Sequence, residues 1–220
     1  MFGFLPLILL ILLFLPALVF LFYFNIAAIS FTKLGLTPEG AMLLFGLSLL
    51  GSVINIPISR RRFVIEGGPV VRFPFPFPFP FIFYYPPRVR EQVIAINFGG
   101  AIVPTAFAIY LLGRAPLVSA VLATAIVAWV AKALARPVSG VGIALPAFIP
   151  PLVAASVAFL LARDNAAPVA YISGSLGTLI GADLLNLRWI RKLGAQVVSI
   201  GGAGVYDGIF LVGVVAALLA

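Results

Sequence analysis

The sequence predicts an all-α membrane protein, a polytopic bundle of about seven transmembrane helices that forms one domain over residues 1–220. Of its 220 residues, 63% are hydrophobic and only 9% are charged, whereas a soluble domain carries about 25% charged residues. Apolar stretches of the length that crosses a bilayer, about 20 residues, recur along the whole chain. Basic residues lie at the ends of these stretches, as they do in membrane proteins.

Seven apolar stretches can be separated, and each is interpreted as one span. They are residues 4–24, 39–56, 93–113, 116–135, 140–162, 166–186 and 203–220. The first has no basic segment before it and no small-residue cleavage site, so we interpret it as a retained helix and not a signal peptide. Thr37 before Pro38 predicts the start of the second helix. Pro146, Pro150 and Pro151 predict that the fifth is kinked or partly unwound.

The basic residues fall into two unequal groups. The connections after the second, fourth and sixth spans hold eleven of them: Arg60, Arg61, Arg62, Arg72, Arg88, Arg90, Lys132, Arg136, Arg188, Arg191 and Lys192. The connections after the first, third and fifth spans hold Lys33, Arg114 and Arg163. The positive-inside tendency predicts that the first group is cytoplasmic and that both termini lie outside a multi-pass cell-membrane protein. The net charge of the chain is +8. Because the basic residues lie at the ends of the spans, we expect them to contact lipid headgroups and not nucleic acid.

The longest connection, residues 57–92, is the one candidate for structure outside the membrane. Residues 62–66 and 69–72 flank Gly67-Gly68, which predicts a short cytoplasmic β-hairpin. Phenylalanine and proline then alternate over residues 73–81, and this excludes a helix or a central strand. An interfacial anchor or lid is one interpretation of this repeat, and a strand that binds a partner or a peptide is the other.

The chain has no cysteine and no histidine. This excludes disulfides, thiol nucleophiles, serine–histidine catalysis and ordinary zinc or haem sites. We therefore expect no metal and no cofactor.

Two aspartates lie inside predicted spans, where an ionisable group costs about 2.5–3.5 kcal/mol to insert. Asp183 is near the end of the sixth span and Asp207 near the start of the seventh. Both spans meet the same basic connection, so the two carboxyl groups are expected at one depth on neighbouring antiparallel helices. Gly181 and Gly204 belong to glycine-lined helix faces that allow close approach and leave room for an extended chain.

Two carboxyl groups at one depth can share a proton and activate water for peptide hydrolysis without a metal. Asp183 and Asp207 are therefore the candidate catalytic pair, with Tyr206, Gly204 and Gly181 as candidate substrate-binding residues and transmembrane peptides as candidate substrates. A proton- or ion-coupled transporter or channel and a non-catalytic structural subunit remain alternatives, with each aspartate then capping a helix or pairing with Arg188, Arg191 or Lys192. Asn55 and Asn97 are interpreted as hydrogen-bonding residues within irregular helices. We expect Ser173, Ser175 and Thr178 to bond to their own helix.

Residues 181–187 (Gly-Ala-Asp-Leu-Leu-Asn-Leu) and 200–211, with the pattern Ile-Gly-Gly-Ala-Gly-x-x-Asp-Gly-Ile-Phe-Leu, resemble a family of small archaeal and bacterial membrane proteins of unknown function. A more distant resemblance is to the presenilin and signal-peptide-peptidase group of intramembrane aspartyl proteases, which place one aspartate on each of two neighbouring helices. Asp183 and Asp207 match those two by placement, and this resemblance implies intramembrane proteolysis. The sequence departs from that group at Tyr206, where the Gly-x-Gly-Asp motif has glycine, and Pro146-Ala147-Phe148 only partly matches its Pro-Ala-Leu element.

Overall fold

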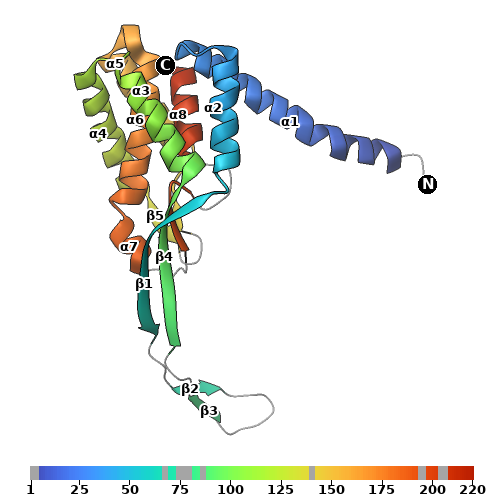
Figure 1. Cartoon of the computed structure of the whole chain (residues 1–220), viewed down its shortest axis with the longest axis vertical. Coiled ribbons are helices and arrows are strands. Elements are labelled where there is room, and N and C mark those ends of the chain that lie inside the picture. The colour runs from blue at the N-terminus through green and yellow to red at the C-terminus, as the bar shows by residue number, and fades with distance from the viewer. Residues whose placement is uncertain are drawn as a thin grey trace.

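The computed structural model describes residues 5–65, 69–72, 81–84, 88–138, 142–192, 197–202 and 208–220. The chain is mainly helical, as predicted, with a bundle at one end and a small sheet at the other (Figure 1). The α-helices are α1 (Leu5–Lys33), α2 (Pro38–Gly51), α3 (Val103–Leu112), α4 (Leu117–Leu134), α5 (Ile149–Leu161), α6 (Ala166–Thr178), α7 (Leu187–Lys192) and α8 (Gly208–Leu219). Two π-helical segments, η1 (Phe98–Ile102) and η3 (Leu179–Leu184), and one 3₁₀ turn, η2 (Arg163–Asn165), join them.

The prediction of an all-α fold holds for the bundle but not for the whole chain, because strands extend the bundle beyond its basic end (Figure 1). They are β1 (Asn55–Ile65), β2 (Pro69–Arg72), β3 (Phe81–Tyr84), β4 (Arg88–Asn97), β5 (Arg136–Val138), β6 (Gly142–Ala144) and β7 (Val197–Ile200). The order in the three-stranded sheet is β1-β4-β7, with β1 and β4 antiparallel and β4 and β7 parallel. The pairs β2–β3 and β5–β6 form separate two-stranded sheets.

The predicted hairpin has the wrong pairing. Strand β1 pairs with β4 and not with β2 across Gly67-Gly68, and Arg62 lies opposite Glu91. A turn at the glycines would allow only a few cross-strand pairs, whereas β1 and β4 form ten and β7 adds to them. The register shifts between Pro57 and Ser59, which suits proline because it cannot donate a ladder hydrogen bond.

Several helix boundaries follow the sequence and others do not. Helix α2 begins after Thr37, whose hydroxyl oxygen accepts a hydrogen bond from the Gly40 N–H at 3.2 Å, which confirms the predicted cap. The fifth segment is partly unwound as predicted, since β6 and an irregular stretch precede α5 and Pro150 and Pro151 lie in its first turn. The third segment starts as strand β4, because a short run of β-branched residues fits a strand as well as a helix.

Among the residues whose backbone and side chains are both described, two helical stretches are long and apolar enough to cross a membrane by length and composition. They are Leu117–Leu134 and the continuous helical stretch Arg163–Trp189, of 18 and 27 residues. Four shorter apolar helices accompany them: Pro38–Gly51, Phe98–Leu112, Ile149–Leu161 and Ile209–Leu219.

Helix α6 lies at the centre of the bundle, in contact with α3, α4, α5 and α8. Its glycines allow the close packing that the sequence predicts. A Cβ atom on Gly174 would lie 3.4 Å from the Cα of Gly213 in α8, and one on Gly177 would lie 2.7 Å from the Cβ of Val127 in α4. Next to this contact, Phe31, Phe107, Tyr171 and Phe210 form an aromatic core between α1, α3, α6 and α8.

The charged connections separate in space as they do in the sequence. Those after α2, α4 and α6 lie at the sheet end of the bundle, and those after α1, α3 and α5 lie at the opposite end with the C-terminus (Figure 1). The N-terminal part of α1 extends away from the bundle, while its C-terminal part contacts α2 and α8 (Figure 1).

Candidate functional site

Asp183 lies in η3, the π-helical segment that continues α6 toward the sheet. Residues five apart are about 140° apart around an α-helix, but the wider turn of a π-helix brings them to nearly the same face. Asp183 and Thr178 are five apart, and both line one cavity. Single π-helical turns are common at functional sites, so this segment is a first reason to consider Asp183 functional.

One hydrogen bond holds the Asp183 carboxyl group from outside its own helix. Its Oδ2 atom accepts the Gly201 N–H at 2.7 Å. Gly201 has a φ of 89°, and a Cβ atom there would lie 2.8 Å from the Ala101 backbone nitrogen in η1. Only glycine therefore combines this backbone conformation with this close approach. The turn after β7 is thereby held between η1 and Asp183.

A cluster of hydrogen-bonded polar side chains holds β7, the strand that ends just before Gly201. The side-chain oxygen of Asn97 accepts the Gly100 N–H at 2.8 Å, and its amide donates to the Ser52 carbonyl at 2.6 Å and to Asn55 Oδ1 at 3.1 Å. The Ser199 hydroxyl of β7 donates to the same Asn55 oxygen. The interpretation of Asn55 and Asn97 as hydrogen-bonding residues is therefore confirmed, but their placement in irregular helices is wrong, because Asn55 begins β1 and Asn97 ends β4. The cluster joins the C-terminal end of α2, β1, β4, η1 and β7 in one hydrogen-bonded network beside Asp183.

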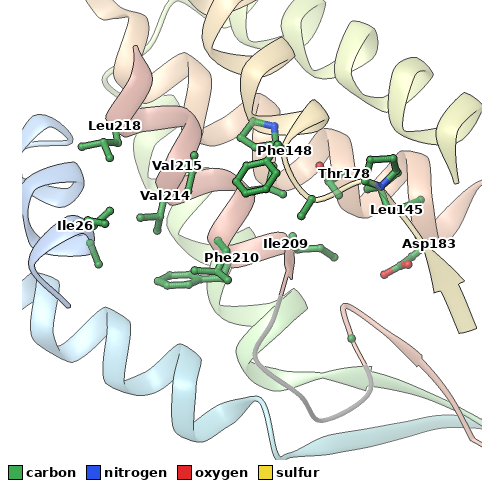
Figure 2. Close-up of a pocket in the computed structure, with 18 of the residues that line it drawn as sticks. Ile26, Leu145, Phe148, Thr178, Asp183, Ile209, Phe210, Val214, Val215 and Leu218 are labelled. Atoms are coloured by element: carbon green, nitrogen blue, oxygen red, sulfur yellow. The ribbon is translucent and has the colours of Figure 1, made fainter. Parts of the chain in front are cut away.

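A cavity of about 630 Å³ opens beside Asp183. Its walls come from α1, α2, the β6–α5 connection, α6 with η3, the turn after β7, and α8 (Figure 2). Among the described lining residues, Thr178 and Asp183 supply the polar side chains and none carries a basic group. The volume is within the range of ligand pockets, about 300–1,000 Å³, and the walls suit an apolar occupant.

The Thr178 hydroxyl does not form the expected hydrogen bond to its own helix. Its side chain is 3% exposed, and its hydroxyl has no hydrogen-bond partner within the described part of the chain. The expected bond to its own helix is formed by Ser173, which donates to the Ala170 carbonyl at 3.3 Å, but not by Ser175 or Thr178. Thr178 was not a candidate from the sequence, because a threonine inside an apolar helix usually bonds to that helix.

The candidate residues from the sequence are placed as follows. Asp183 faces the cavity, whereas Gly181 packs against α4, where a Cβ atom would lie 2.2 Å from the Ala128 carbonyl oxygen. Gly204, Tyr206 and Asp207 lie outside the described residues. Within the described chain the one salt bridge joins Arg62 and Glu91, so Asp183 has no ion pair with Arg188 there. The side chains of Arg191 and Lys192 are not described.

The segment around Pro146 also reaches the site. Pro146, Ala147 and Phe148 line the cavity that contains Asp183, and Figure 2 shows Phe148 there. Sequence reasoning did not place this segment beside the acids, because more than thirty residues separate it from Asp183 and only the packing of α5 against α6 and α8 brings them together.

No curated protein and no solved structure matches the chain. The sequence profile of one family, described as "Protein of unknown function (DUF1614)", matches residues 49–219, which is most of the chain. This finding confirms the resemblance to a family of unknown function, and the chain belongs to the DUF1614 family.

Proposed function

We propose that this chain is a multi-pass membrane protein in which Asp183 and Asp207 form a paired-carboxylate site that hydrolyses membrane-embedded peptides. One observation carries the proposal: the Asp183 carboxyl group faces an apolar cavity whose lining includes both Gly202 and Ile209. Residues 203–208 lie between these two in the sequence, and Asp207 is two residues from Ile209. The proposal therefore puts the second carboxyl group at the same cavity.

The membrane part of the proposal is supported by the surface of α4. Large apolar side chains on this helix are exposed: Leu117, Val118, Val121, Leu122, Ile126 and Trp129, at 41–73% of their area. An apolar helix surface of this extent suits lipid and not water. We propose about seven crossings, with the basic sheet end in the cytoplasm and both termini outside, because basic connections favour the cytoplasmic side.

The proposed chemistry uses both carboxyl groups and one water molecule. The ionised carboxyl group takes a proton from water as the water oxygen bonds to the scissile carbonyl carbon. The protonated carboxyl group gives its proton to the leaving amine as the C–N bond breaks. The Gly201 N–H, bonded to Oδ2 of Asp183, holds the carboxyl group in place, and Oδ1 has no hydrogen bond within the described residues.

A transporter is a weaker interpretation of the same cavity. A conducted ion needs polar groups along its path, whereas the described lining supplies only the Thr178 and Asp183 side chains as polar groups. We therefore prefer hydrolysis, and the experiment below separates the two.

The test uses the full chain in phosphatidylcholine vesicles with an internally quenched transmembrane peptide as substrate. We expect cleavage by the wild type and its loss in Asp183→Asn, in Asp207→Asn and in the double variant to the same extent, because residues that act as a unit are not additive. Asp164→Asn is the matched control, since Asp164 is exposed in η2 between α5 and α6. Cleavage by Asp183→Asn at the wild-type rate would overturn the proposal. Absent cleavage with an ion flux that depends on Asp183 would favour the transporter.

A further inference from the structure

The Thr178 hydroxyl is buried and unsatisfied within the described part of the chain. Buried hydroxyl groups in native proteins almost always have a hydrogen-bond partner, because water solvates them well and an apolar interior does not. Thr178 lines the cavity (Figure 2). The hydroxyl oxygen itself has almost no accessible surface, so a molecule bound in the cavity supplies the missing partner when the Thr178 side chain turns toward it.

The position of this hydroxyl relates it to Asp183. Thr178 ends α6 and Asp183 follows it by five residues across the π-helical segment. Both residues line the cavity, and Figure 2 shows them with Leu145 and Phe148 nearby. A molecule that reaches Asp183 therefore passes close to the Thr178 hydroxyl.

The chemistry of the walls selects the occupant. The described lining offers no basic side chain to a phosphate, and the Asp183 carboxylate repels an anion, so a phospholipid headgroup is disfavoured there. Apolar walls with one hydroxyl donor suit an apolar chain that carries a carbonyl acceptor. A peptide backbone is such a chain.

The backbone must also be unwound. In an intact transmembrane helix every interior carbonyl accepts a hydrogen bond from its own helix, since lipid offers no alternative. Only an unwound segment presents a free carbonyl, and that carbonyl needs a donor from the protein.

We infer that the cavity binds an unwound apolar segment of a transmembrane peptide, and that the Thr178 hydroxyl donates a hydrogen bond to one of its backbone carbonyl groups. The inference names the substrate of the proposed function and so rests on the same site, but it concerns binding and not cleavage. Thr178 is a substrate-binding residue in this scheme, and Asp183 belongs to the reacting pair.

The experiment measures binding of two probe peptides to the full chain in phosphatidylcholine vesicles. Each peptide has about 21 leucine and alanine residues, lysines at both ends and a central photo-crosslinking side chain, and one also has a central Gly-Gly pair that favours unwinding. All protein variants carry Asp183→Asn, so that cleavage cannot consume the probe. The crosslinking yield against peptide concentration gives the apparent Kd.

We expect saturable binding of the Gly-Gly peptide and an increase of its Kd by about three- to tenfold in Thr178→Val, the range for one neutral hydrogen bond. Thr178→Ser keeps the hydroxyl and should keep the affinity. The peptide without glycines should bind more weakly and respond less to Thr178→Val. Valine has nearly the shape of threonine, and Thr178→Ala is the second variant if Thr178→Val lowers thermal stability.

Equal affinities of Thr178→Val and Thr178→Ser for the Gly-Gly peptide would overturn the inference. So would Thr178-dependent crosslinking of a photoreactive fatty acid without crosslinking of either peptide, because the occupant would then be a lipid. Binding that depends on Thr178 without cleavage by the wild type would leave this inference standing and remove the hydrolysis proposal. Cleavage by the wild type, with a KM that is unchanged in Thr178→Val, would remove this inference and leave the hydrolysis proposal standing.

Discussion

Replacing Gly181 by alanine tests the closest helix contact beside the site. The added Cβ atom would lie 2.2 Å from the Ala128 carbonyl oxygen and 2.9 Å from the Ala128 Cα atom, both in the backbone of α4. Ordinary contact begins at 3.4 Å, so the α4 backbone has to move by about 1.2 Å (3.4 − 2.2). Inserting one extra carbon into a packed interior costs about 1–3 kcal/mol.

The matched control is Gly46→Ala. Gly46 also lies in a helix, α2, but a Cβ atom there would meet nothing within 4 Å. Alanine should therefore stabilise this helix by about 0.5–1 kcal/mol, because glycine loses more backbone entropy on folding. The free energies of unfolding of the two variants should differ by about 1.5–4 kcal/mol, with opposite signs relative to the wild type.

Thermal unfolding in detergent micelles, followed by circular dichroism, measures this difference. At about 2–4 °C per kcal/mol for a chain of this size, the Tm of Gly181→Ala should fall by about 2–12 °C and that of Gly46→Ala should rise by about 1–4 °C. A Gly181→Ala variant at least as stable as Gly46→Ala would refute the close packing of η3 against α4, and with it the placement of Asp183 two residues further on.

Two further substitutions test the supports of the sheet. Asn97→Ala should lower the free energy of unfolding by about 1–3 kcal/mol, because it leaves the buried Ser52 carbonyl without the Asn97 amide; an unchanged Tm would contradict this hydrogen-bond assignment. Glu91→Gln should change the free energy of unfolding by less than about 1 kcal/mol, because the side chains of Arg62 and Glu91 are 78% and 48% exposed; a large loss, measured by the same thermal unfolding, would show that the pair is stabilising beyond its exposure.

The helix positions were largely predictable, and the strands were not. The predicted fourth span, residues 116–135, agrees with α4 at Leu117–Leu134, because an apolar run of this length without proline or glycine inside it favours one continuous helix. Residues 93–97 were assigned to a helix but belong to β4. Their β-branched side chains suit either element, and the partner strands β1 and β7 decide between them.

At the candidate site the sequence singled out Asp183 but neither of its structural neighbours. Thr178 lies on the same helix face as Asp183 only because η3 has a π-helical turn, and the spacing of apolar residues in the sequence does not predict such a turn. Gly201 could be recognised as a turn residue, yet its bond to Asp183 depends on the parallel pairing of β7 with β4.

The sequence by itself determined that this chain is mainly helical, where its longest helices lie, and which connections carry the basic residues. These properties depend on the transfer of individual side chains from water, which is local and nearly additive along the chain. The tertiary structure alone decided the pairing of β1 with β4, the contact of Gly201 with Asp183 and the cavity that joins Thr178, Asp183 and α8. Each of these depends on which distant segments meet, and that is set by packing between elements and not by any one of them.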